Sequence, residues 1–160
     1  MKEIKLTQGK VVLIDDEDYE MVSQFKWRYL SGYAVYSDNS KVIRMHRLIM
    51  KCPVNMQIDH IDGNGLNNMR NNLRICTKTQ NSRNTKKTHK NCSSKYKGVY
   101  FINGYNYWRA QLEICLNNKR KHISAGIYKT EIEAAVAYNE IAKKMFGEYA
   151  KLNVIEKCGW

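Results

Sequence analysis

The sequence predicts an α+β protein built from two small units, residues 1–84 and 94–160, that are joined by a basic linker, residues 85–93. Three observations support this class. Hydrophobic residues make up 43% of the 160-residue chain, which is enough for packed cores. Short apolar runs bounded by turn signals recur in both units, as in small antiparallel sheets. A single amphipathic helix with a capping box follows the strands of the second unit.

Composition argues against several broad classes of protein. No run approaches the roughly 18 apolar residues of a membrane span, and the polar, mixed-charge start at Met1–Lys10 does not have the form of a secretory signal. The five cysteines are scattered and include no Cys-x-x-Cys pair, which argues against a disulfide framework and against a structural zinc site. We therefore expect a basic protein of the cytoplasm that makes no contact with membranes.

Positive charge is concentrated in the middle of the chain. The formal net charge is +12, and the stretch from Gly63 to Leu112 holds ten Lys or Arg residues and no Asp or Glu. Internal pairing cannot neutralise such a stretch, so it creates a lasting positive field. The partner that this field favours is a polyanion, most commonly a nucleic acid. The alternative is a solvated basic surface that serves solubility.

The first third of the chain predicts a series of short elements. Residues 4–14 indicate two strands around a turn at Gln8-Gly9. The acidic run 15–20 suits the first turn of a short helix, where carboxylates face the helix dipole, and we interpret it as a solvated helix start rather than a metal site. An aromatic-rich extended segment, 27–36, and an apolar element, 42–50, follow.

Polar residues then recur at three corners of a strand–loop–strand–helix pattern. Asp59 and His60 are adjacent, Asn72 follows His60 by twelve residues, and Asn81 follows Asn72 by nine. Because neighbouring strand residues point to opposite sides, Asp59 and His60 can share one site only where the strand ends and the backbone turns.

The second strand and the helix of this pattern have their own signals. Residues 73–76 have the composition of a strand, and Thr77 is a suitable N-cap for a helix over 78–83. The alternative is that Asp62-Gly63-Asn64 is an ordinary turn and His60 a surface imidazole.

These residue types suit the hydrolysis of a phosphodiester bond. That reaction needs an activated water and a cation on the developing charge. A neutral histidine can take a proton from water near neutral pH. Aspartate and asparagine oxygens are hard ligands that suit Mg²⁺, with water and phosphate in the other positions.

The segment from Asp59 to Asn81 resembles the HNH endonucleases, the ββα-metal fold, and in particular their homing-endonuclease branch. The resemblance implies that His60 is the general base, that Asp59 and Asn81 bind a divalent metal, and that Asn72 braces the loop and orients His60. The metal is expected to be Mg²⁺, with Mn²⁺ as the alternative. His46 precedes the motif, as in many relatives, and is a candidate neighbour of the active site; a packing or phosphate-contacting role is the alternative.

The second unit has the pattern of a small sheet covered by one helix. Residues 96–102, 107–116 and 121–128 alternate like strands. Thr130 to Glu133 forms a capping box, and the apolar positions that follow have helical spacing up to a stop at Gly147. By parity, one face carries the apolar residues Val99, Ala110, Leu112, Ile123 and, as a packing residue, Trp108.

Four blocks between residues 94 and 153 resemble an AP2 domain, which is a three-stranded antiparallel sheet packed on one helix. The resemblance implies that the free face of the sheet lies in the major groove of double-stranded DNA. The predicted DNA contacts in this unit are Lys97, Tyr100, Arg109, Gln111, Lys119, Arg120, Lys121, His122 and Ser124, joined by Arg83, Lys86 and Lys87 before and within the linker. Arg109 and Gln111 could grip base edges; contact with phosphates only is the alternative.

Together the two resemblances imply a metal-dependent homing-type DNA endonuclease of a phage, prophage or mobile intron. The sequence leaves the oligomeric state open, with a monomer favoured. The products would carry 3′-hydroxyl and 5′-phosphate ends. The main alternative is a DNA-binding regulator whose HNH centre is inert. A third hypothesis, an RNA-binding protein, rests on the exposed Tyr100.

Overall fold

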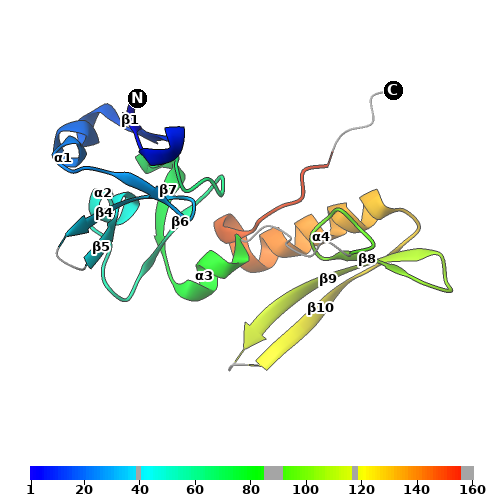
Figure 1. Ribbon diagram of the computed structural model, residues 1–160. Coiled ribbons are helices and arrows are strands. Elements are labelled where there is room, and N and C mark those ends of the chain that lie inside the picture. Colours follow the sequence, from blue (N-terminus) through cyan, green and yellow to red (C-terminus); the bar gives the residue numbers. More distant parts are fainter. Residues whose placement is uncertain (39–40, 85–91, 117–118, 156–160) are drawn as a thin grey trace. The chain divides into compact units, whose positions relative to one another are not determined.

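The computed structural model describes residues 1–38, 41–84, 92–116 and 119–155. The chain divides into two compact units, Met1–Asn84 and Thr85–Trp160 (Figure 1). Most of the predicted linker, including Lys86 and Lys87, lies outside the described residues. Ser93, the last residue of the predicted linker, and Ser94 are part of the second unit, where they bond to Phe101 and Glu131.

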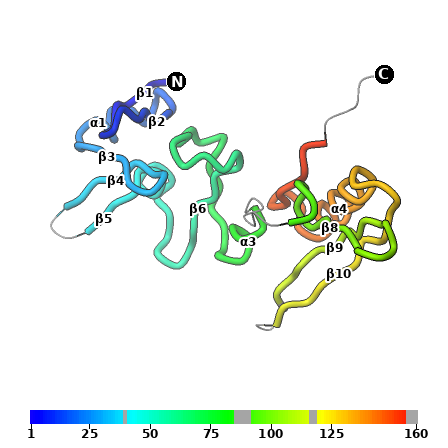
Figure 2. Tube along the Cα trace, turned by 45° about the vertical axis from the view of Figure 1, so that its right-hand side comes forward, coloured from blue at the N-terminus to red at the C-terminus, as the bar shows by residue number. Residues whose placement is uncertain are grey.

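The first unit opens with a β-hairpin, as the sequence predicts. Strands β1 (Lys2–Lys5) and β2 (Val11–Ile14) pair antiparallel around a turn in which Gln8 has a φ of +62°. The alternation of β2 places Val12 and Ile14 in the core, where both are fully buried. A 3-10 turn, η2 (Asp16–Asp18), and the short helix α1 (Tyr19–Ser23) follow (Figure 2).

A three-stranded antiparallel sheet comes next. It consists of β3 (Arg28–Leu30), β4 (Tyr33–Asp38) and β5 (Lys41–Arg44), and it leads into α2 (Met45–Ile49). The predicted apolar element 42–50 is therefore split between a strand and a helix. Trp27 packs near Phe25 and Tyr36, so the aromatic residues of this region form part of the core.

The strand–loop–strand–helix pattern is confirmed. Strand β6 (Gln57–His60) pairs antiparallel with β7 (Leu73–Cys76), and α3 (Lys78–Arg83) follows directly. Thr77 and Gln80 form a full capping box at the start of α3. The loop between the strands, residues 61–72, ends in the 3-10 turn η3 (Arg70–Asn72).

The acidic run before α1 is not simply a solvated helix start, which corrects the interpretation made from the sequence. Asp18 is only 2% exposed, and both of its oxygens accept from the guanidinium of Arg70, at 2.9 and 2.6 Å. Asp15 accepts the backbone N–H of Arg70 at 2.7 Å. These bonds tie the N-terminal hairpin to the loop between β6 and β7. The sequence could not show this, because the partners are more than fifty residues apart.

The second unit has three antiparallel strands in the order β10-β9-β8, and helix α4 lies along the sheet (Figure 1). The elements are β8 (Val99–Ile102), β9 (Tyr107–Leu116), β10 (Lys119–Tyr128) and α4 (Glu131–Phe146). The predicted apolar face is confirmed, since Val99, Ala110, Leu112, Ile123 and Trp108 pack in one core with α4.

The first strand of this sheet begins three residues later than predicted. Gly98 has a φ of +72°, so the backbone turns there and Tyr96 lies before the strand. A Cβ atom at position 98 would collide with the ring of Tyr138 from α4, so the close approach of strand and helix also requires glycine. Among the described residues, no helix is long and apolar enough to cross a membrane.

The clamp between Arg70 and Asp18 predicts a measurable loss of stability. Arg70→Met should lower the free energy of unfolding of the first unit by about 2 kcal/mol, because it leaves a buried carboxylate without its charged partner. Arg28→Met is the matched control, since Arg28 only reaches the exposed Ser37 hydroxyl. Urea denaturation of both variants measures the difference, and equal effects would contradict the importance of the clamp.

Candidate active site and nucleic-acid face

Asp59 is a buried carboxylate that joins three elements. It lies on β6, is 4% exposed, and its Oδ2 accepts from Nε and Nη2 of Arg74 on β7 at 2.8 and 2.5 Å. Its Oδ1 accepts from Nδ2 of Asn84 at 2.8 Å, and Asn84 is the residue that directly follows α3. The same Asn84 amide reaches the carbonyl oxygen of His60 at 2.9 Å. The end of α3 is thereby fixed to the end of β6.

His60 faces a different set of partners. Its ring is 6% exposed, and Nε2 lies 2.9 Å from Oδ1 of Asn68 in the loop. The rings of His46 and Tyr33 lie 5.0 and 5.9 Å from the His60 ring, measured between centroids. Asp59 and His60 therefore occupy adjacent positions whose side chains bind separate groups, as alternation along a strand requires.

His46 comes from α2 and is packed against this centre. It is 6% exposed, and its ring meets the His60 ring edge to face, at an interplanar angle of 88°. Burial, and then the neighbouring charges of His60, Arg44 and Arg47, lower the pKa of His46 to about 3. His46 is therefore neutral at physiological pH.

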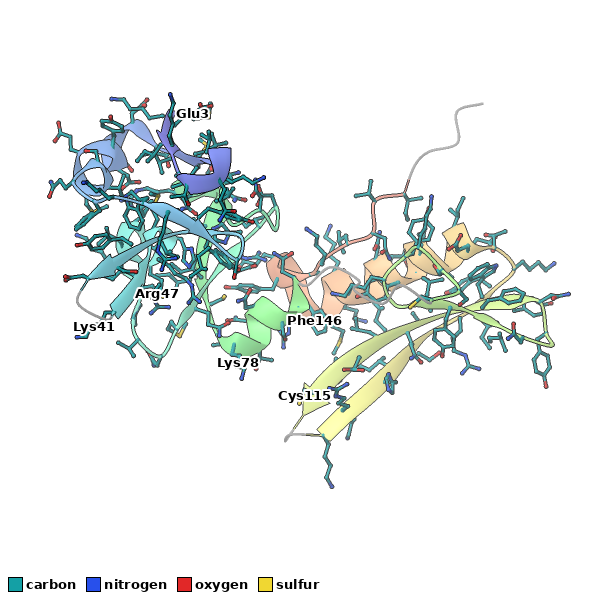
Figure 3. The ribbon with its side chains drawn as sticks, viewed as in Figure 1. Glu3, Lys41, Arg47, Lys78, Cys115 and Phe146 are labelled. Atoms are coloured by element: carbon teal, nitrogen blue, oxygen red, sulfur yellow. The ribbon has the colours of Figure 1, made fainter. Side chains whose placement is uncertain are left out.

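The arginine after His46 fixes the approach to β6. Arg47, labelled in Figure 3, donates to the carbonyl oxygens of Met56 at 2.9 Å, Pro53 at 2.8 Å and Cys52 at 3.2 Å. One guanidinium thus satisfies three carbonyls of the turn that leads into the strand.

Asn72 bonds across the loop that follows His60. Its Oδ1 accepts the backbone N–H of Asp62 at 3.0 Å, and its Nδ2 donates to Asp62 Oδ1 at 3.0 Å and to the Asn67 carbonyl at 2.8 Å. Burial opposes ionisation of Asp62, but hydrogen bonds from Asn64, Asn67 and Asn72 outweigh it and hold the pKa of Asp62 below its usual range. The charged Asp62 carboxylate and the Asn72 amide thus hold the two ends of the loop together.

Asn81 lies one helical turn before Asn84 and has another partner. Its Nδ2 donates to Oε1 of Gln57 at 2.8 Å. Residues two apart on a strand share a face, as do residues three apart on a helix, so Gln57 faces Asn81 just as Asp59 faces Asn84. The spacings Gln57-x-Asp59 on the strand and Asn81-x-x-Asn84 on the helix could have predicted these two pairs from the sequence. Sequence reasoning missed Asn84, Arg74 and Asn68 as neighbours of the motif.

The groups around Asp59 are hydrogen-bond donors, because Arg74 and Asn84 donate to both of its carboxylate oxygens. Side chains from β6 and from the end of α3 meet there, but Asn84 presents its amide nitrogen, Nδ2, to Asp59 Oδ1 at 2.8 Å, and an N–H group that donates cannot bind a cation. Among the described residues, no group of three or more His, Cys, Asp and Glu side chains could hold a metal. A cation could bind here only if the Asn84 amide turned its oxygen toward the Asp59 carboxylate, with water and phosphate completing a set that Mg²⁺ accepts.

The face of the second sheet opposite α4 carries a network of polar side chains. Tyr100 donates its hydroxyl to Gln111 Oε1 at 2.8 Å, and Arg109 reaches the same hydroxyl at 3.5 Å. Gln111 Nε2 lies 3.4 Å from Nδ1 of His122 on β10. Ser124 is exposed and directly opposite Gln111. Five of the predicted DNA contacts are thus neighbours on this face: Tyr100, Arg109, Gln111, His122 and Ser124.

The other predicted DNA contacts that the structure describes are Lys97, Lys119, Arg120, Lys121 and Arg83. Lys119, Arg120 and Lys121 are exposed at the start of β10, and Arg120 is 3.6 Å from Glu113. Cys115, labelled in Figure 3, marks this end of the β9–β10 hairpin. Burial, and then the charge of Lys151, lower the pKa of Lys97. Arg83 is half-buried in the last turn of α3.

Comparison with known proteins gives two matches. A family model described as HNH endonuclease matches residues 45–83, which include α2, β6, β7 and α3. The chain is also 37% identical, over 157 residues, to an uncharacterized HNH endonuclease, L560, of Acanthamoeba polyphaga mimivirus; the match covers 93% of this chain and 78% of the relative. No solved structure matches the chain. Neither match names an AP2 domain, so that resemblance stays a prediction.

The buried, neutral His46 predicts a pH dependence of stability. The unfolded chain binds a proton at His46 below about pH 6.5, whereas the folded chain does so only near pH 3, so this residue lowers stability as the pH falls through that window. Between pH 7 and pH 4.5 the loss should be about 2–3 kcal/mol. Urea denaturation at several pH values measures this dependence. The free energy of unfolding of His46→Leu should vary less with pH than that of the wild type, whereas that of His122→Leu, a change at an exposed histidine, should vary as in the wild type.

Proposed function

The chain belongs to the HNH endonuclease family, and we propose that it is a metal-dependent DNA endonuclease of the homing type. The observation that carries the proposal is the arrangement at the end of β6. His60 is held through one ring nitrogen by Asn68, and the neighbouring residue Asp59 directs its carboxylate to the Asn84 amide. Each part has a role in the hydrolysis of a phosphodiester bond.

His60 is proposed as the general base. A carbonyl oxygen can only accept a hydrogen bond, so the contact with Asn68 Oδ1 places the ring hydrogen of neutral His60 on Nε2. Nδ1 is then the nitrogen that can take the proton from an attacking water. Asn72 closes the loop beyond His60 and is proposed to keep the ring in place. The neutral His46 packs against the ring as a further neighbour.

Asp59 is proposed to hold a divalent cation, with Mg²⁺ favoured, together with the amides of α3. Asn84, the C-cap of α3, donates its amide nitrogen to Asp59, and Asn81, one turn earlier, donates to Gln57, so each amide would have to turn its oxygen toward the cation. The cation would supply positive charge to the phosphate group as negative charge develops on it. Arg74 offsets the single negative charge of Asp59, so cation binding is expected to be weak until phosphate oxygens join the site.

The second unit is proposed to bind double-stranded DNA with its free sheet face. Arg109 and Gln111 have the donor and acceptor groups that recognise guanine and adenine edges in the major groove. Their bonds to Tyr100 and His122 hold them in place before DNA arrives, which reduces the entropy lost on binding. Further DNA contacts are proposed around this face: Lys97, Lys119, Arg120, Lys121 and Ser124. Three more are proposed earlier in the chain, namely Arg83, Lys86 and Lys87.

A second candidate function, a DNA-binding regulator with an inert centre, is favoured by one observation. Both oxygens of Asp59 already accept hydrogen bonds, and the carboxylate is buried, so a cation could reach it only if the bonds to Arg74 or Asn84 change. Tight binding of DNA with no cleavage under Mg²⁺ or Mn²⁺ would support this function.

A plasmid assay tests the nuclease. The wild-type chain should convert supercoiled plasmid to nicked circles in Mg²⁺ and not in EDTA, because a chain with one centre cuts one strand at a time. His60→Ala should slow cutting by at least about 100-fold and retain DNA affinity. His122→Ala is the matched control in the other unit: it should weaken binding and keep the metal dependence. A His60→Ala variant that cuts normally would contradict the assignment.

Arg109 tests the DNA-binding face. Arg109→Ala should raise the dissociation constant for duplex DNA by about 5- to 100-fold, measured by fluorescence anisotropy, and Arg28→Ala in the first unit should not. Equal loss on all sequences, with a salt slope that falls by about one, would indicate a phosphate contact. A larger loss on one sequence would indicate base reading. An unchanged affinity would remove Arg109 from the interface.

A further inference from the structure

We propose that Asn68 is a positioning residue that fixes the tautomer of His60, and that the N-terminal hairpin, which lies outside the family match, holds Asn68 in place. The structural part of this inference stands alone, and its catalytic consequence rests on the proposed function. Asn68 lies eight residues after His60 in the loop between β6 and β7.

The contact between the two side chains determines the roles of the ring nitrogens. Asn68 is fully buried, and its Oδ1 is 2.9 Å from His60 Nε2. A histidine ring has two tautomers, and a partner at one nitrogen selects between them. With an accepting oxygen at Nε2, the ring hydrogen stays there and the lone pair stays on Nδ1. Without Asn68, both tautomers become accessible and the ring loses its orientation.

The other amide atom of Asn68 shows that the side chain is not there for packing alone. Among the described residues, only His46 Nδ1 and Asn68 Nδ2 are buried side-chain atoms without a hydrogen-bond partner. A buried amide nitrogen without a partner is costly, and an apolar side chain of the same shape would avoid that cost. An asparagine here is explained by the one strong contact it makes, to His60.

The backbone of Asn68 is anchored by β2 rather than by its own loop. Its N–H donates to the Leu13 carbonyl at 2.8 Å, and the Leu13 N–H donates to the Leu66 carbonyl at 2.9 Å. Two residues further on, Arg70 is bonded to Asp15 and Asp18. The segment from Leu66 to Arg70 is therefore held at both ends by the hairpin and the turn after it, and Asn68 lies between.

Tight packing on another side leaves the loop little freedom to move. Gly65 lies against the turn between β3 and β4, where a Cβ atom would collide with the Gly32 carbonyl and the ring of Tyr33. Tyr33 in turn packs near His46 and His60. The loop that presents Asn68 is thus enclosed by elements from residues 11–33, before the family match begins at residue 45.

The test is the nitrogen NMR spectrum of the His60 ring in the full chain without metal or DNA, assigned with His60→Ala. The wild-type ring should show a protonated Nε2 and an unprotonated Nδ1 at neutral pH. Asn68→Leu should give a mixture of tautomers and lower kcat by about 10- to 100-fold, with KM for DNA changed less than twofold. Asn67→Leu is the matched control: it alters the neighbouring side chain, which bonds Asp62 instead, and should keep the Nε2 tautomer.

Several outcomes would overturn the proposal. A wild-type ring protonated on Nδ1 would do so even if no variant folds, and so would an Asn68→Leu variant that keeps the Nε2 tautomer. Fast exchange of the Asn68 amide hydrogen, compared with that of Val12 in the core, would remove the anchoring role of the hairpin. A chain that shows the expected tautomers but cuts no DNA would contradict only the proposed function.

Discussion

Asp59 is a carboxylate in the interior of a small unit, where a charge is stable only when its oxygens are paired. Arg74 supplies the charge and Asn84 the remaining hydrogen bond, from the neighbouring strand and from the end of α3. Satisfying this one group fixes the relation of β6, β7 and α3. The position of His60 follows from it, because Asn84 also bonds the His60 carbonyl.

The alternation of β6 directs the side chains of the two adjacent motif residues, Asp59 and His60, to separate groups of partners. Asp59 faces Arg74 and the Asn84 amide, and His60 faces Asn68, His46 and Tyr33. The two groups of contacts are kept in register by the loop that Asn72 closes. Residues far outside the motif complete this arrangement, since the hairpin holds the loop through Leu13 and through the pair of Asp18 and Arg70.

The second unit applies a simpler constraint. Apolar and polar residues alternate along its strands, so one face of the sheet packs on α4. The other face carries polar side chains that form hydrogen bonds with one another. Tyr100 links Arg109 and Gln111, so both are ordered without a ligand. Such ordering would reduce the entropy lost if this face binds duplex DNA as proposed.

The sequence by itself determined the local elements of this protein. The capping boxes at Thr77 and Thr130, the alternation of β9 and the spacing of Asp59, His60 and Asn72 depend on neighbouring residues, and they predicted the strands, the helices and the motif. Tertiary structure alone decided that Asp18 is buried on Arg70, that Asn84 rather than Asn81 meets Asp59, and that Asn68 meets His60. The members of each pair lie in different segments, and these segments come into contact only when whole strands and helices pack together. A local sequence pattern carries no information about such contacts.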